Sequence, residues 1–383
     1  MIADESSLRS GGDQIRTLFT LIRQQDGITR QQLSDRLQIP ATTLNRLINR
    51  LMNLGLIQEA GLADSSGGRR PSLYSIAETP YRLLGLDISA ARSQLVLINL
   101  RLVILDQVDL PGLAELPAAG LIEQISDAIG RLLERQSVEA VHVLGLGIGW
   151  AAAADQDPDG APDRLPVYLR DLLSRITSSW NFPVSTVRGA DAALYAGLWL
   201  DRSLSDRHLL YFSIGRNIRA GLAWQGQFHQ TGLTTDQVNR LKLGINRQGG
   251  ARELGQIATQ PAMLERYRQL KKEASLSWLD FCGAAGKGKK KALQVMREAA
   301  RAVSVAVYNA SLITATDDLL LGGPALNDSP ELEAMIRGEL SDLIEDRGTP
   351  RLLDQPHHDR LMAVGAAAYA LEQMMDHRLG TDS

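Results

Sequence analysis

Three helix-like apolar patterns and a loop tipped with glycine and arginine occupy the first 77 residues, and few folds accommodate that order. Apolar side chains recur at i, i+3, i+4 and i+7 within residues 15–22, which predicts a helix over residues 13–25. Thr29 lies three residues before Gln32, the spacing of a capping box, and predicts that a short second helix begins there. A third helix after Pro40 would complete a helix-turn-helix.

The third predicted helix begins at Ala41 and separates apolar from polar side chains. Its apolar face is formed by Leu44, Leu47, Ile48 and Leu51. The opposite face has no carboxylate, which a phosphate backbone would repel, and its short hydroxyls, amides and guanidinium groups can reach phosphates and base edges. We therefore expect a recognition helix that contacts DNA through Thr42, Thr43, Asn45, Arg46, Asn49 and Arg50.

Two strand-like runs, residues 56–60 and 72–76, are joined by a polar loop at residues 64–70. Two glycines in this loop let the backbone approach a groove closely, and Arg69 and Arg70 suit a narrow minor groove or the flanking phosphates. The alternative interpretation is a short helical bundle with a solvated arginine loop. The combination of helices, strands and arginine tip favours a winged helix-turn-helix domain.

Composition limits what the whole chain can be. With 383 residues and 44% hydrophobic side chains, it can form two or three domains. No stretch approaches ~18 apolar residues, so neither export nor membrane insertion is expected. The single Cys282 excludes an internal disulfide and fits a location in the cytoplasm. Residues 1–80 carry a net charge of only +1, a weak basic asymmetry against −4 for the remainder.

From residue 81 the pattern changes to that of an α/β domain. Strands are predicted at residues 83–88, 94–99, 102–108 and 140–148, and a helix at residues 120–135. A second strand pair at residues 209–214 and 220–224 indicates a duplicated, two-lobed architecture. We place the boundary at residues 78–80, which gives a DNA-binding domain over residues 1–79 and a body over residues 80–383.

The order of these pieces resembles the ROK family (repressors, open reading frames and sugar kinases) over nearly the whole chain. It is most similar to the repressor branch, in which a winged helix precedes an actin-like, ribonuclease H-like kinase fold. The family's opening phosphate loop, roughly Asp-Ile-Gly-Gly-Thr-Lys, is matched by Asp-Ile-Ser-Ala-Ala-Arg at residues 87–92. Its Gly-Ile-Gly-x-Pro-Gly run is matched by Gly-Ile-Gly-Trp-Ala-Ala at residues 147–152.

A second glycine-rich turn of the family is similar to residues 215–221, where Asn217 and Arg219 replace two glycines. Phosphates need backbone amides that side chains do not obstruct, so these changes should weaken nucleotide binding. Arg219 could bind an anion instead, or form a surface salt bridge.

The resemblance also implies lost catalytic chemistry. The family's catalytic run, Asn-Asp-Ala-Asn-Ala-Ala, is matched by residues 188–193, and the aspartate that acts as base maps to Gly189, which cannot accept a proton. A shifted register would make Asp191 the base but would spoil the match of the alanines that follow. We expect no catalytic residue.

The family's zinc and sugar loop is matched without gaps by residues 232–259. On this match Asp236 replaces a sugar-binding glutamate, Asn239 replaces the zinc-binding histidine, and the three zinc cysteines become Gly249, Ala251 and Gln256. A second sugar-binding glutamate becomes Ala258. No metal or other cofactor is therefore expected. A possible effector pocket remains, formed by Arg188, Asp191, Asp236 and Asn239; the last two could hydrogen-bond a polyol or lie in an ordinary surface loop.

Two further motifs have simpler interpretations. Residues 283–289 fit Gly-x4-Gly-Lys, but Lys290 stands where a P-loop needs Ser or Thr, so a solvated basic loop is expected. His357 and His358 have only Asp359 beside them and are interpreted as a pair at a helix start.

Together these features predict a transcriptional regulator, a repressor, that binds double-stranded DNA at a pseudo-palindromic operator as a homodimer or a dimer of dimers. The body would serve for dimerisation and for sensing a small molecule such as a sugar. One alternative is an ATP-dependent sugar kinase with a DNA-binding appendage. The other is a pseudokinase scaffold that binds a protein partner.

Overall fold

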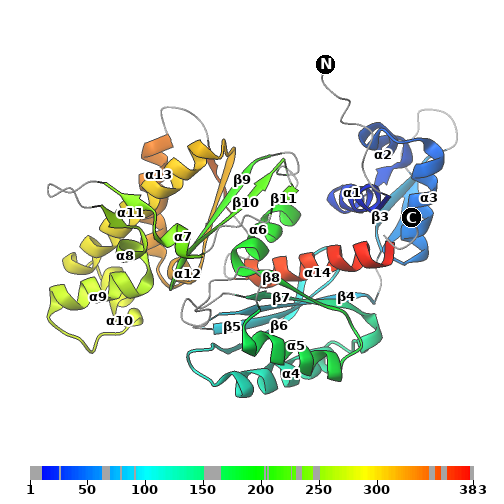
Figure 1. Cartoon of the computed structure of the whole chain (residues 1–383). Helices are drawn as coiled ribbons and strands as arrows, with labels where there is room; N and C mark the ends of the chain where they lie inside the picture. Colours follow the sequence, from blue (N-terminus) through cyan, green and yellow to red (C-terminus); the bar gives the residue numbers. More distant parts are fainter. Residues whose placement is uncertain are drawn as a thin grey trace. The chain divides into compact units, whose positions relative to one another are not determined.

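The computed structural model of the chain forms two compact units (Figure 1). It describes residues 11–25, 27–62, 70–77, 80–89, 92–150, 165–201, 204, 207–225, 227–229, 235–244, 251–344, 350–354 and 360–379. The first unit comprises Met1–Ile148, Asp171–Thr186 and Ala366–Ser383, and the second comprises Gly149–Arg170 and Val187–Gly365. The winged helix-turn-helix thus shares a unit with the first lobe of the body.

The winged helix-turn-helix has three helices and a three-stranded sheet. The helices are α1 (Gly11–Gln24), α2 (Arg30–Leu37) and α3 (Ala41–Asn53). The strands are β1 (Ile28–Thr29), β2 (Ile57–Leu62) and β3 (Ser72–Ile76), in the order β1-β3-β2. The apolar stripe of α1 is buried, and Thr29 and Gln32 form the predicted capping box at the start of α2. These local predictions are confirmed, but β1 had not been anticipated.

The first lobe is built on a five-stranded sheet of order β6-β5-β4-β7-β8. Its strands are β4 (Arg82–Ile88), β5 (Arg92–Ile98), β6 (Ile104–Pro111), β7 (Val143–Trp150) and β8 (Val184–Arg188). The helices are α4 (Ala118–Arg135), α5 (Val167–Ser179) and α14 (Leu361–Leu379). Figure 1 shows α4 and α5 on one face of the sheet and α14 on the other.

The second lobe repeats this plan with a sheet of order β11-β10-β9-β14-β15. Its strands are β9 (Leu209–Ile214), β10 (Ile218–Trp224), β11 (Gln227–His229), β14 (Asp318–Gly322) and β15 (Arg351–Leu352), and a separate pair joins β12 (Lys242–Leu243) to β13 (Arg252–Glu253). The helices are α6 (Gly189–Leu200), α7 (Thr235–Asn239), α8 (Gly255–Ala258), α9 (Gln260–Lys271), α10 (Trp278–Gly286), α11 (Lys290–Ile313), α12 (Pro324–Asp328) and α13 (Pro330–Ile344).

Some predicted boundaries moved for identifiable reasons. The strand expected at residues 102–108 begins at Ile104, because the Asn99 side chain accepts hydrogen bonds from the backbone of Arg101 and Val103, and Leu102 takes a positive φ of 61°. This builds a turn where the sequence had suggested a strand.

The prediction of a basic loop at residues 283–289 was wrong in part. Its first four residues lie in α10, which a Ser277–Asp280 capping box starts and which buries Phe281 and Cys282. The pair His357 and His358 lies outside the described residues. No helix in the described part of the chain is long and apolar enough to span a bilayer.

Candidate nucleic-acid interface

Helix α3 is anchored by one buried face. Its four predicted apolar residues are at most 1% exposed: Leu44, Leu47, Ile48 and Leu51. Pro40 stands at the N-cap, where its missing N–H costs nothing, and the first turn carries no acidic residue. Burial of this stripe fixes the rotation of α3 about its axis and turns its polar side chains outward.

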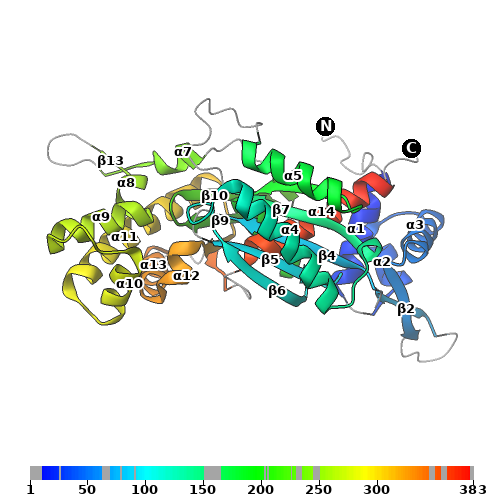
Figure 2. The ribbon, with the colours of Figure 1, turned by 90° about the horizontal axis from the view of Figure 1, so that it is seen from below.

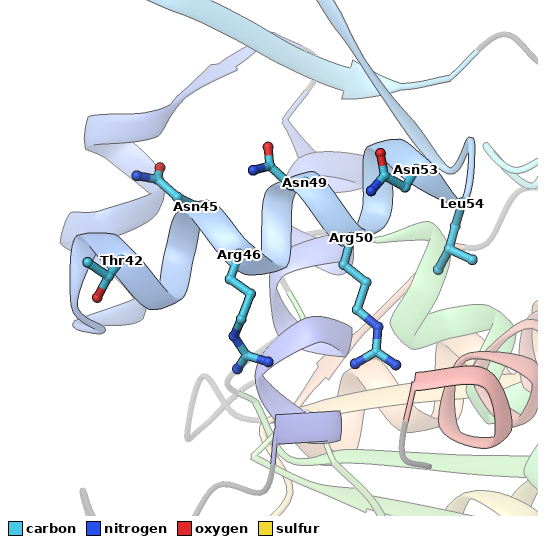
Figure 3. Close-up of a pocket in the computed structure, with 7 residues that line it drawn as sticks. All are labelled: Thr42, Asn45, Arg46, Asn49, Arg50, Asn53 and Leu54. Carbon is cyan, nitrogen blue, oxygen red and sulfur yellow. The ribbon is translucent and has the colours of Figure 1, made fainter. Parts of the chain in front are cut away.

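The polar side of α3 borders an open hollow of about 700 Å³ (Figure 3). Asn45, Asn49 and Asn53 follow one another at i, i+4 spacing and form a row of amides. Arg46 and Arg50 form a neighbouring row that begins with the Thr42 hydroxyl. The structure therefore brings an amide row and a guanidinium row together on one helix, which gives a surface with both hydrogen-bond donors and acceptors.

One amide in this hollow is poorly satisfied. The Oδ1 atom of Asn45 is buried and has no hydrogen-bond partner in the described part of the chain. Buried polar atoms in proteins nearly always have a partner, and this acceptor would reach a ligand in the hollow only after the side chain turned outward. An asparagine amide pairs in a bidentate manner with N6 and N7 of adenine in a major groove.

The predicted contact residues are placed unevenly. Thr42, Arg46 and Asn49 are exposed, whereas Thr43, Asn45 and Arg50 are half-buried. Sequence reasoning missed Asn53 and Leu54, which also line the hollow. The i+4 spacing from Asn49 would have identified Asn53, because the next turn of the same row falls there.

The wing is braced against α2. Arg30, the first residue of α2, donates from Nη2 to the Tyr74 hydroxyl of β3 at 2.6 Å. The pairing of β2 with β3 shifts register between Glu59 and Leu62, and Gly61 takes a φ of 120° there. Of the predicted tip, Arg70 is exposed and Arg69 lies outside the described residues.

The winged helix-turn-helix also contacts the rest of the first unit. Arg16 of α1 donates from Nη1 to Glu372 Oε1 of α14 at 2.8 Å, and both side chains are partly buried. Arg101 donates from Nη2 to the Ile76 carbonyl at the end of β3, at 3.5 Å. The DNA-binding domain is thus attached to its lobe by charged side chains that leave most of α3 open.

In the second unit, a methionine occupies the space beside Gly189. A β-carbon built on Gly189 would overlap Sδ of Met362 and would lie 3.5 Å from the Trp150 carbonyl oxygen. Gly189 begins α6 directly after β8. A longer side chain at this position would have to displace the Met362 thioether.

The glycine-rich turn between β9 and β10 is closed by a side chain. Asn239 accepts a hydrogen bond from the Ile218 backbone N–H at 2.9 Å and donates from Nδ2 to Asn217 Oδ1 at 3.1 Å. A backbone donor of the kind that a phosphate would need is therefore already engaged.

Asp191 is the buried member of the predicted effector set. It is 5% exposed, and burial raises its pKa to about 7, although the positive charge of Arg188 acts in the opposite direction. Arg188 is half-buried at the end of β8. Asp236 lies in α7, but its side chain is outside the described residues. Among the side chains that are described, no three of the His, Cys, Asp and Glu type are grouped as metal ligands.

Comparison with known proteins matches both parts of the chain. The ROK family model covers residues 83–373, and a MarR family model covers residues 10–70. A transcriptional regulator of Mycobacterium tuberculosis is 23% identical over 341 residues, which cover 85% of this chain and 77% of the relative. The xylose repressor of Bacillus spizizenii is 21% identical over 393 residues, 98% of each chain.

Two solved structures share the fold. A ROK family transcriptional regulator, a homologue of the Mlc protein of E. coli, superposes with a TM-score of 0.68 at 17% identity and covers 96% of this chain and 98% of its own. A ROK family glucokinase from Streptomyces griseus, in complex with glucose and AMPPNP, superposes with a TM-score of 0.60 at 17% identity. The match covers 76% of this chain and 99% of the glucokinase. The two-lobed kinase-like fold and the winged helix are thus both confirmed.

Proposed function

The chain belongs to the ROK family, and from that premise we propose that it is a transcriptional repressor that binds operator DNA through α3 and the wing. The observation that carries this proposal is the pair of polar rows on α3, which presents three amides and two guanidinium groups to the hollow. Arginine and asparagine are the residues that most often read guanine and adenine. Their presentation on a helix with no carboxylate suits a major groove.

The operator would be a pseudo-palindrome bound by a homodimer or a dimer of dimers. A symmetric dimer presents two copies of α3, which reach successive major grooves when half-sites lie about one helical turn, roughly 34–36 Å, apart. The DNA-binding domain would span residues 1–79 and the body residues 80–383. Such a role would place the protein in the cytoplasm with the chromosome.

The body would act as a sensor and a dimerisation module and not as a kinase. Phosphoryl transfer to a sugar needs a base near the hydroxyl and open phosphate turns. Gly189 offers no base, and Asn239 fills the turn at Asn217. Relatives named xylose repressor make a sugar the natural class of effector to test, with Arg188 and Asp191 as the first candidate contacts.

The test begins with recovery of an operator. Purified full-length protein is mixed with sheared genomic DNA of its source, and bound fragments are sequenced; an inverted repeat bound at nanomolar affinity is expected. Arg46→Ala should then weaken binding to that operator by roughly 5- to 150-fold, the equivalent of about 1–3 kcal/mol for one base contact. Arg175→Ala, which removes an exposed arginine from α5, is the matched control and should bind as the wild type does. Equal affinity of all three proteins would refute the assignment of α3.

A further inference from the structure

The lysines of this chain are gathered in one segment of the second lobe. The chain has seven lysines and 34 arginines, and six of the seven lysines fall within residues 271–291. All six are exposed, and we name them the lysine cluster: Lys271, Lys272, Lys287, Lys289, Lys290 and Lys291. Because residues 271–291 hold only two acidic residues, the segment carries a net charge of +4.

The fold brings the two ends of this segment together. Lys291 of α11 donates from Nζ to the carbonyl oxygen of Leu270, at the end of α9, at 2.7 Å. Lys287 and Lys289 flank Gly288, whose φ of 70° turns the chain from α10 into α11. Figures 1 and 2 both show α9, α10 and α11 side by side at one corner of the lobe. The six lysines therefore lie at adjoining ends of α9, α10 and α11.

Two of these lysines lie at a helix N-terminus, where a positive charge is unfavourable. Lys289 is the N-cap of α11 and Lys290 begins its first turn, which has no acidic residue and no side-chain cap. The N-terminus of a helix carries partial positive charge, so cations there are repelled.

Two nearby carboxylates bond to serines and not to the lysines. Asp280 accepts hydrogen bonds from the Ser277 backbone and hydroxyl, and Glu331 accepts one from Ser329. In the described part of the chain, no lysine of the cluster takes part in an ion pair. Without ion pairs, these exposed ammonium groups remain available to an anionic partner.

We propose that the lysine cluster binds the phosphate backbone of duplex DNA without regard to its sequence, an inference that rests on the proposed function. A lysine binds a phosphate as a point charge, and such a contact does not depend on the base sequence. Residues 287–291 contain only lysine and glycine, and Leu279 is the one large exposed apolar side chain of residues 271–291, whereas protein partners normally bind a cluster of apolar or aromatic anchors. Since residues 1–80 carry a net charge of only +1, the winged helix alone provides little sequence-independent attraction to DNA.

The experiment compares the full chain with a variant that carries Lys287→Gln, Lys289→Gln and Lys290→Gln. Lys291 is kept because of its hydrogen bond to Leu270. Affinity is measured against salt for a 60-bp duplex with the operator at its centre, a 20-bp operator duplex and a random 60-bp duplex. Loss of three phosphate contacts makes the slope of log affinity against log salt shallower by about 2.7. Between 50 and 200 mM salt the affinity of the variant should therefore fall about 40-fold less than that of the wild type.

We expect this change in slope on both 60-bp duplexes, whether or not they contain the operator. The matched variant with arginine at the same three positions keeps the charge and should behave as the wild type does. An unchanged slope on 60-bp DNA, with wild-type operator binding intact, would overturn this inference alone. Binding to polyglutamate that depends on the three lysines, without a change in DNA slope, would assign the surface to an acidic protein. Wild-type protein that binds none of the duplexes would refute the proposed function itself.

Discussion

Asp191→Asn should stabilise the protein at alkaline pH and much less at acidic pH. Burial raises the pKa of Asp191 from 3.8 to about 7, with Arg188 opposing the rise. Because the pKa is higher in the folded state, the contribution of this group to the free energy of unfolding is full below pH 3.8 and is lost as pH rises toward 7. At about 1.4 kcal/mol per pKa unit the loss amounts to about 4 kcal/mol at pH 8.

Urea unfolding of the variant and the wild type, at pH 5.5 and pH 8, measures this loss. Between those pH values the variant's advantage should grow by about 2 kcal/mol, since roughly half of the loss falls above pH 5.5. Asparagine has nearly the shape of aspartate and never ionises, so packing is kept. Asp171→Asn, at an exposed site on α5, controls for the change in net charge. An advantage of equal size at both pH values would refute the reasoning.

Two further predictions concern contacts described above. Gly189→Asp should lower the free energy of unfolding by roughly 1–3 kcal/mol, because its side chain displaces Met362, and a coupled ATP assay with hexoses should detect no phosphoryl transfer. A double-mutant cycle of Arg16→Ala and Glu372→Ala, followed by urea unfolding, should give a coupling energy of about 0.2–1 kcal/mol, since the pair is only partly buried. A coupling energy of zero would mean that the ion pair does not hold the winged helix in place.

Local patterns made most of the DNA-binding domain predictable. The apolar spacing of α3 gave its buried face, and the Thr29–Gln32 capping box gave the start of α2. Both signals lie within one or two turns of the chain. They therefore act through neighbouring residues and can be read from the sequence.

Long-range contacts could not be read in the same way. Strand β1 is two residues long and exists through pairing with Leu73 and Tyr74, more than 40 residues away. Arg16 and Glu372 are 356 positions apart. The part of Asn239 in closing the turn at Asn217 depends on the folded path between β10 and α7. The periodicity of the sequence does not predict these long-range contacts.

Met362 has an evolutionary consequence. If an ancestor of this chain had a carboxylate at position 189, its loss made room that Met362 now fills. Mutation of codon 189 alone would bring back an acid that does not fit, and selection would see a less stable protein before it saw any new activity. A return path needs a change at Met362 first, and that change by itself leaves a cavity. Either single change on the way back would thus destabilise the protein, which makes the change at position 189 hard to reverse.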